Sequence, residues 1–127
     1  MRAGTILFLS ALLMALGGCR GGNPATPAVF SVAMIGDPVH GRVLIEEFKC
    51  GACHTIPGVS AARGVVASPL FWFSRRSFIA GEVPNTPPNL VKWVRDPRAI
   101  EPRTAMPAVG LNEDEARDVA AYLYTLR

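Results

Sequence analysis

Apolar residues recur at helical spacing in three segments of the chain, and each segment starts where a helix is expected to start. The first starts at Asp37-Pro38, because Asp is a good N-cap and Pro is favoured at the first helical position. The second runs from Pro87 to Arg95, and Pro97 stops it because proline cannot continue the helical hydrogen bonds. The third follows Asn112, another N-cap residue, and opens with acidic residues that the helix dipole favours.

Each of these segments predicts one apolar helix face. The apolar positions are Val39, Val43, Leu44 and Phe48 in the first helix, which leads towards Cys50; Leu90, Trp93 and Val94 in the second, with Thr86 as its N-cap; and Ala116, Val119, Ala120, Leu123 and Leu126 in the last. Residues 55–85 and 96–110 show no period and are interrupted by Pro and Gly, so we expect long loops there with at most a short helical turn. Strands are scarce, because few segments alternate. The predicted fold class is therefore mainly α, and the long loops are expected to enclose a bound group.

Composition narrows the class of protein. The chain has 127 residues, 50% of them hydrophobic and 18% charged, which is enough apolar material for one folded domain and excludes a disordered chain. The 13 Lys and Arg residues exceed the 10 Asp and Glu residues by only three, without a basic cluster. We therefore expect no nucleic-acid partner.

The N-terminus predicts a sorting signal. The apolar run Thr5–Leu16 is shorter than the ~20 residues that a membrane-spanning helix needs, and it ends in Leu16-Gly17-Gly18-Cys19. That ending resembles a bacterial lipobox, in which the cysteine is lipidated and becomes the mature N-terminus. We predict a lipoprotein signal peptide at 1–18 and a lipidated N-terminus and linker at 19–36. The alternative is an ordinary signal peptide in which Cys19 is incidental.

Cys50-Gly51-Ala52-Cys53-His54 is the attachment signature of c-type haem. On one helical turn, Cys50 and Cys53 direct both sulfurs to the same porphyrin edge, and His54 points its imidazole at the iron. A thioredoxin-type site is disfavoured because no βαβ pattern surrounds the cysteines. A zinc site would need further ligands, and the other histidine is His40. A structural disulfide would leave His54 unexplained.

Met106 is the candidate for the second axial ligand of the iron. Met106-Pro107 lies in the second Pro-rich loop, and a thioether favours ferrous iron and raises the potential relative to two histidines. Met34 is a rival ligand, although it precedes the haem motif and falls in the expected linker. The alternative for Met106 itself is a residue that fills the core.

Residues 37–127 resemble a class I c-type cytochrome domain, and within that class the cytochrome domain fused to subunit II of some haem-copper oxidases. The residues that carry the resemblance are Gly41, Ile45, Cys50, Cys53, His54, Ser74, Arg75, Arg76, Gly81, Asn85, Thr86, Leu90, Trp93, Asp96, Pro97, Pro102, Met106, Pro107 and Asp118 to Leu126. The resemblance implies one covalent haem c, wrapped by short helices and long loops.

The resemblance also implies helix contacts and a proximal hydrogen bond. Gly41 and Ile45 should meet the last helix, where Gly permits a close crossing; the expected contacts there are Val119, Tyr122 and Leu123. Pro69 resembles the proline whose carbonyl accepts a hydrogen bond from the proximal imidazole. The chain departs from the family pattern on both sides of that proline, with Ser68 before it and Leu70 after it.

Further residues are matched to the surroundings of the haem. Arg75 or Arg76, Asn85 and Trp93 are candidates for binding the haem propionates, with solvated loop charges and an ordinary core Trp as the alternative. Phe71-Trp72-Phe73 is expected to form pocket wall or core, and a partner-docking patch is the other interpretation. Glu101 stands where the oxidase-type pattern more often has Lys.

The function that follows is one-electron transfer, not enzyme catalysis. Both axial positions of the iron are expected to be filled by His54 and Met106, so no small-molecule substrate is bound. The expected partners are redox proteins: a terminal oxidase, a quinol-oxidising complex or another reductase. Lipid on Cys19 would hold the protein at the periplasmic side of the envelope, and Arg20 after that cysteine resembles the pattern of lipoproteins sorted to an outer membrane.

Two alternatives from other classes remain open. The chain could be a fixed electron-transfer subunit of a membrane oxidase or quinol-oxidising complex, with the same chemistry and a permanent partner. It could also be a haem sensor or enzyme in which Met106 dissociates and opens the iron. Reactivity of the ferrous form with CO separates this second alternative from a carrier.

Overall fold

The computed structural model describes residues 35–127. The predicted signal peptide, Cys19, the linker up to residue 34 and the rival ligand Met34 lie outside the described residues. In chain order the elements are α1 (Pro38–Glu47), η2 (Cys50–Ala52), η3 (Phe73–Arg75), β1 (Phe78–Ile79), β2 (Val83–Pro84), α2 (Pro87–Arg95), η4 (Pro97–Ala99) and α3 (Glu113–Thr125), where η marks a single 3₁₀ turn. The described part is mostly helical with little sheet, as predicted.

The three predicted helices are present, and their caps explain two of the three starts. The Asp37 carboxylate accepts hydrogen bonds from the backbone N–H groups of Val39 (2.8 Å) and His40 (3.4 Å) at the start of α1. At α3, Asn112 Oδ1 accepts from Glu115 N (3.0 Å) while the Glu115 carboxylate accepts from Asn112 N (2.8 Å), a reciprocal capping box. Thr86 occupies the N-cap position of α2 in extended conformation without a side-chain bond.

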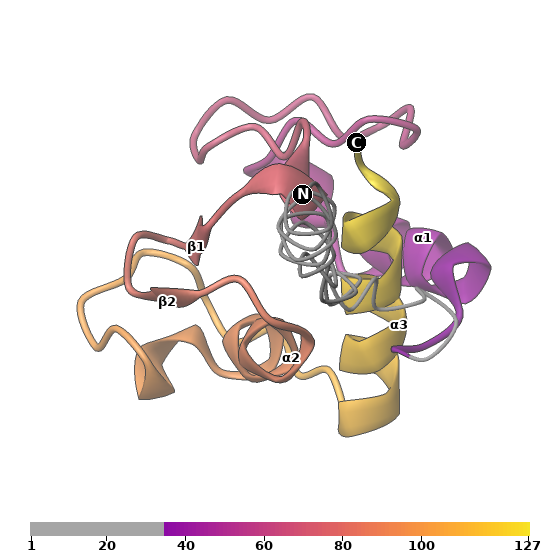
Figure 1. The fold of residues 1–127 in the computed structure, drawn as a ribbon. Coiled ribbons are helices and arrows are strands. Elements are labelled where there is room, and N and C mark those ends of the chain that lie inside the picture. Colours follow the sequence, from indigo (N-terminus) through magenta and orange to yellow (C-terminus); the bar gives the residue numbers. More distant parts are fainter. Residues whose placement is uncertain (1–34) are drawn as a thin grey trace, which may run out of the picture.

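A close crossing of α1 and α3 organises the core (Figure 1). A Cβ atom added at Gly41 would collide with the backbone carbonyl of Asp118 on α3, so only glycine permits this approach. Around the crossing, Ile45 is 1% exposed, and Val119 and Leu123 are buried as well. The predicted contact between the first and last helices is therefore confirmed.

Gly41→Ala should destabilise the protein by about 1–3 kcal/mol or more, because the added methyl group forces two packed backbones apart. The measurement is the free energy of unfolding in urea. The prediction that Val39 and Val43 belong to the apolar face of α1 is wrong, because both are exposed. Val43→Ala is therefore the matched control and should stay within about 0.5 kcal/mol of the wild type. A Gly41→Ala protein as stable as the control would contradict the crossing.

The start of α1 is also tied to α3 by an ion pair. His40 Nδ1 lies 2.7 Å from Asp118 Oδ2, and Asp118 Oδ1 accepts a hydrogen bond from the backbone N–H of Asp37 (2.7 Å). The hydrogen bond to Asp118 raises the pKa of His40 above its ordinary value of 6.5, and the charges of Asp118, Asp37 and Glu115 add to the effect. The imidazolium form therefore stabilises this helix contact.

Because the pKa of His40 is raised on folding, its stabilising effect is complete below pH 6.5 and is lost as pH rises through the folded-state value. We expect His40→Gln to lower the urea midpoint more at pH 5.5 than at pH 8.5. Comparing variant with wild type at each pH removes contributions from other titrating groups. An equal difference at both pH values would contradict the ion pair.

The region between η3 and α2 was predicted to be a loop, but it contains two short strands. β1 and β2 pair antiparallel, with Ile79 opposite Val83 and Phe78 opposite Pro84. The chain reverses between them through Ala80 and Gly81, both with positive φ (53° and 82°). Strands of two residues are too short to show an alternating pattern, which is why the sequence did not reveal them.

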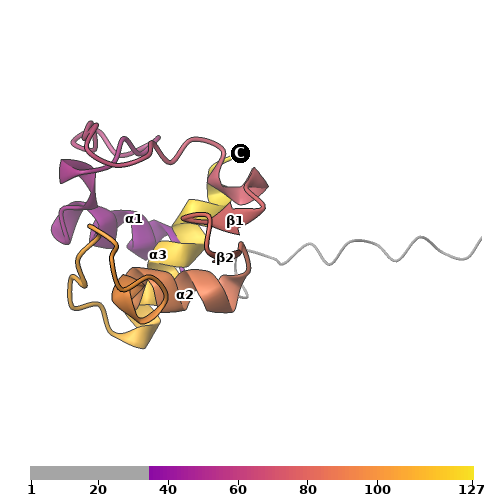
Figure 2. The same ribbon diagram turned by 90° about the vertical axis from the view of Figure 1, so that its left-hand side faces the viewer.

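Two groups of segments lie towards opposite ends of α3. In Figures 1 and 2 the segment 50–72 runs over one end of the molecule, whereas β1, β2, α2 and the loop after it occupy the other. The first group carries Cys50, Cys53 and His54, and the second carries Met106. Within residues 35–127 no helix has the length and apolar run required to cross a membrane.

Candidate haem-binding site

Cys50, Cys53 and His54 share one tight turn directly after α1. Lys49 takes a left-handed conformation (φ 57°) that ends the helix and redirects the chain into η2. Within the turn, the backbone N–H groups of Cys53 and His54 both donate to the Cys50 carbonyl, at 3.3 and 3.1 Å. The three side chains therefore project from adjacent points of one turn, as the spacing of the motif requires.

The two cysteines are free thiols, which excludes a disulfide between them in this structure. Burial raises the pKa of the Cys50 thiol, and this side chain packs against the hydrophobic core. Among residues 35–127, no three His, Cys, Asp or Glu side chains are grouped so as to hold a metal ion. The zinc interpretation therefore finds no ligand set in the described part of the chain.

Two close backbone contacts, which no pattern in the sequence indicates, hold this turn. A Cβ atom at Gly51 would lie 2.5 Å from Ala62 Cα, and one at Gly64 would lie 2.5 Å from the Ala52 carbonyl oxygen. Thr55 Oγ1 also donates to the Gly64 carbonyl (2.8 Å). Glycines are frequent in this chain, so their presence alone does not indicate which of them permit a close approach.

The His54 imidazole is held by a backbone carbonyl, but not by the predicted one. Its Nδ1 lies 2.8 Å from the Ser68 carbonyl oxygen; since a carbonyl only accepts, Nδ1 carries the proton and Nε2 is available to a metal. The prediction that the Pro69 carbonyl fills this role is wrong by one residue. The Pro69 carbonyl instead accepts a hydrogen bond from the Arg76 guanidinium.

The register of two chain segments explains this shift. Ala67 N donates to the Cys53 carbonyl (2.9 Å), and Leu70 N donates to the Thr55 carbonyl (2.8 Å). These bonds align residues 67–70 with residues 53–55, so that Ser68 comes opposite His54. No local pattern in the sequence determines that alignment.

Arg76 clamps the loop that follows. Its guanidinium donates to the Pro69 carbonyl and to the Phe71 carbonyl (3.3 Å), and it lies over the Phe73 ring at 5.5 Å from the centroid. Arg75, its neighbour, is exposed. The two arginines proposed for the propionates therefore differ: Arg76 is engaged with the protein, and Arg75 is exposed.

Asn85 braces the same segment from the other side. Its amide nitrogen donates to the carbonyls of Phe73 and Arg76, both at 3.0 Å, and its Oδ1 accepts from the Tyr124 hydroxyl at 2.9 Å. Burial raises the pKa of Tyr124 to about 12, so this hydroxyl stays a donor at any physiological pH. Both amide hydrogens of Asn85 are thus already used by carbonyls of the protein, which gives it a positioning role for residues 73–76.

Met106 and Trp93 lie on the other group of elements. Trp93 is buried on α2, and Met106 is partly buried and packs against the core. The loop between them is held by its own bonds: Thr104 N donates to the Glu101 carbonyl (3.0 Å), and Arg103 N donates to the Glu101 carboxylate (2.8 Å). Glu101, the departure from the oxidase-type pattern, therefore stabilises the turn before the methionine.

The donor set fits a covalently bound haem. Cys50 and Cys53 offer two free thiols on one turn, which is the arrangement for two thioether bonds at one porphyrin edge. His54 offers a free Nε2, because its Nδ1 proton is already bound. Residues so close in the chain are always near one another. The evidence that they suit a haem is therefore the conformation of the turn and the hydrogen bond between His54 Nδ1 and the Ser68 carbonyl.

Comparisons with known proteins show the family of the chain. The sequence profile of the family described as Cytochrome c matches residues 39–127. The chain is 36% identical over 89 residues to the cytochrome c oxidase subunit 2 of Alkalihalophilus pseudofirmus, a match that covers 68% of this chain and 25% of that protein. The chain thus matches about a quarter of that relative. No solved structure matches significantly. The chain belongs to the cytochrome c family, whose members carry covalently attached haem c, and it has the class I cytochrome c fold.

Proposed function

We propose that the protein is a membrane-anchored mono-haem cytochrome that passes single electrons between respiratory redox partners. The observation that carries the proposal is the His54 ring, held through Nδ1 by the Ser68 carbonyl on the turn that also bears both free cysteines. A metal-binding histidine is usually oriented in this way by a partner on its other nitrogen. Membership of the cytochrome c family supports electron transfer as the general activity.

In this proposal the residues of the site bind the haem and orient the His54 ring. Cys50 and Cys53 would hold the haem covalently, and His54 and Met106 would bind its iron. The bound haem supplies a one-electron Fe(III)/Fe(II) couple. The Ser68 carbonyl fixes the tautomer and orientation of the His54 ring and increases its basicity.

The candidates for binding the haem propionates fall into two groups, according to whether their side chains already donate hydrogen bonds to the protein. Arg75 is exposed, and the Trp93 side chain on α2 is buried without a hydrogen bond to another described residue, so these two remain proposed contacts. Arg76 supports the site by clamping the Pro69 and Phe71 carbonyls, and Asn85 supports it by holding residues 73–76. Filling both axial positions leaves no place for a substrate, so we propose a carrier and not an enzyme.

The anchor is proposed from Leu16-Gly17-Gly18-Cys19. Lipid on Cys19 would place the cytochrome domain on the periplasmic side of the envelope, within reach of a terminal oxidase, a quinol-oxidising complex or another reductase. More than one acyl chain is needed for a stable anchor, and lipidated N-terminal cysteines supply this.

A fixed subunit of an oxidase is the second candidate function. It is favoured by the 36% identity to a cytochrome c oxidase subunit 2. In that case the chain would have the same chemistry with a permanent partner. Purification from native membranes in mild detergent separates the two, because a fixed subunit remains with its complex whereas a carrier is released alone.

The proposal is tested on the isolated protein by a redox titration and by exposure to CO. We expect one haem per chain and a single one-electron transition. The ferrous form should not bind CO at neutral pH, because both axial positions are filled. Prompt CO binding by the wild type would overturn the carrier and favour the sensor or enzyme.

A further inference from the structure

An exposed aromatic pair precedes η3. Phe71 and Trp72 are 43% and 62% exposed, and their ring centroids lie 6.0 Å apart. Trp72 also has a positive φ of 50°, in the left-handed region that costs a bulky residue roughly 1–2 kcal/mol. Such strain persists where the surrounding structure imposes it, and it concentrates at functional positions. Trp72 therefore combines backbone strain with little burial.

Hydrogen bonds hold the backbone of the turn that presents this pair in place. Phe73 is buried beneath it, and Ser74 donates to the Leu126 carbonyl through both its backbone N–H (3.1 Å) and its hydroxyl (2.9 Å). The Phe71 carbonyl is held by Arg76, and the Phe73 carbonyl by Asn85. Aromatic side chains on a turn fixed in this way lose little conformational entropy when they bind.

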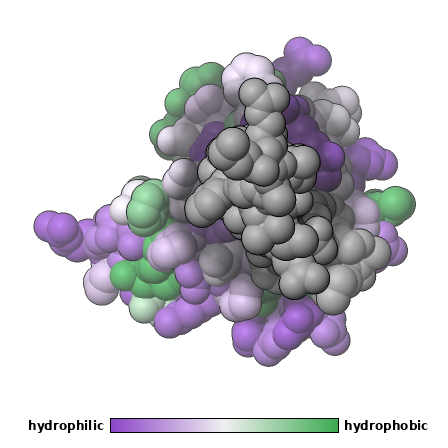
Figure 3. Space-filling view, viewed as in Figure 1, coloured by the Kyte–Doolittle hydropathy of each residue, from purple (hydrophilic) through white to green (hydrophobic). Residues whose placement is uncertain are grey.

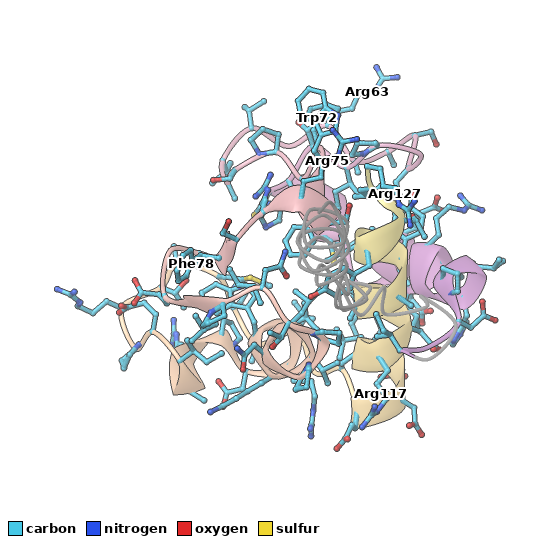
Figure 4. All side chains as sticks on the ribbon, viewed as in Figure 1. Arg63, Trp72, Arg75, Phe78, Arg117 and Arg127 are labelled. Atoms are coloured by element: carbon cyan, nitrogen blue, oxygen red, sulfur yellow. The ribbon has the colours of Figure 1, made fainter. Side chains whose placement is uncertain are left out.

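The surroundings of the pair are basic and apolar. Residues 48–81 contain Lys49, Arg63, Arg75 and Arg76 and no Asp or Glu. Figure 4 shows Arg63, Trp72 and Arg75 at the same end of the molecule, whereas Phe78 and Arg117 lie elsewhere. Val65 and Val66 of the same loop are exposed, and Figure 3 shows hydrophobic side chains on the surface at this end.

We propose that Phe71, Trp72, Arg63 and Arg75 form the contact surface for a redox partner protein that presents carboxylates around an apolar patch. Tryptophan and arginine are the side chains that most often anchor protein interfaces. Arg63 and Arg75 form no ion pair within the described residues, so their charge can steer an acidic partner to this end. The surface is also close to the proximal ligand along the chain, because Ser68, which binds His54, precedes Trp72 by a few residues. This inference rests on the proposed function.

The first test uses the ferrous haem-loaded protein and an acidic blue copper protein as oxidant. One electron passes from the cytochrome to the cupric ion, and no bond or proton is transferred. We expect Trp72→Ala to lower the second-order rate constant about tenfold, as when an interface anchor is truncated. Arg63→Gln, at a residue with no proposed haem contact, should lower it about two- to threefold, and the effect should diminish at high salt.

Matched controls come from the other parts of the molecule. Phe78→Ala removes an exposed aromatic ring, and Arg117→Gln removes an exposed positive charge, both away from this end (Figure 4). Neither should change the rate with the copper protein. Trp72→Ala should react with ferricyanide, a small oxidant that needs no protein docking, as fast as the wild type.

A second measurement reports contact directly. With both proteins reduced, the indole N–H signal of Trp72 should shift on addition of the copper protein, whereas that of buried Trp93 should not. The proposal is overturned if Trp72→Ala reacts at the wild-type rate, or if it changes the absorption spectrum or potential, which would place Trp72 against the haem. It is also overturned if the Trp72 signal shifts only with vesicles of phosphatidylcholine and phosphatidylglycerol. A wild type that ferricyanide does not oxidise contradicts the proposed function itself.

Discussion

Replacing Cys50 and Cys53 together by alanine should reduce the haem content from one covalent haem per chain to none. Both thiols are free and lie on one turn, so each can form one thioether bond, and no other cysteine is present among residues 35–127. Loss of the haem should also lower the urea midpoint strongly, since a group bound only by the folded state stabilises that state. The mass and colour of the denatured chain measure attachment, and circular dichroism measures folding.

The chain supplies its own control in its third cysteine. Cys19→Ser should leave the haem mass unchanged and should release the protein from membranes if Cys19 carries the lipid. Each single variant, Cys50→Ala or Cys53→Ala, should reduce attachment sharply. A double variant that keeps its haem after denaturation, or a colourless wild type from a host able to attach haem c, would contradict the site.

Met106→His should lower the redox potential by on the order of 0.2 V, a fraction of the roughly 0.8 V that axial ligands span. Imidazole favours ferric iron more than a thioether does. Met106→Ala should remove the weak red absorption band of a ferric sulfur–iron bond and open the ferrous site to CO, with the thioether bonds at Cys50 and Cys53 intact. Absorption spectra and potentiometric titration measure these changes.

Met34→Ala is the control for the identity of the sulfur. It removes the rival thioether and should leave the band and the potential unchanged. Loss of the band in Met34→Ala, or its retention in Met106→Ala, would mean that another residue is the second axial ligand.

The helices follow from short-range chemistry, which is why the sequence predicted them well. Asp37-Pro38 and Asn112 start helices because their side chains bind N–H groups two or three residues ahead. Pro97 follows the end of α2 because it cannot continue a helix. The Cys50–His54 motif is equally local, since a single turn brings its three side chains together.

Contacts between distant segments account for the differences. Ser68 and not Pro69 binds His54, because hydrogen bonds between residues 53–55 and 67–70 set the register. Asn85 was matched to the haem by resemblance, yet its amide is used by two carbonyls of the η3 region. In both cases the residues could form the predicted hydrogen bonds. The packing of loops that lack hydrophobic periodicity determined which donor and acceptor came together.

The sequence alone therefore determined the three helices, their caps and the haem-attachment turn, because each depends on residues within about one helical turn of one another. Only the tertiary structure decided that Ser68 holds His54 and that Trp72 stays exposed on a strained turn. The physical reason is that a hydrogen bond or close contact needs two partners in register, and loops without periodicity carry no local signal for that register.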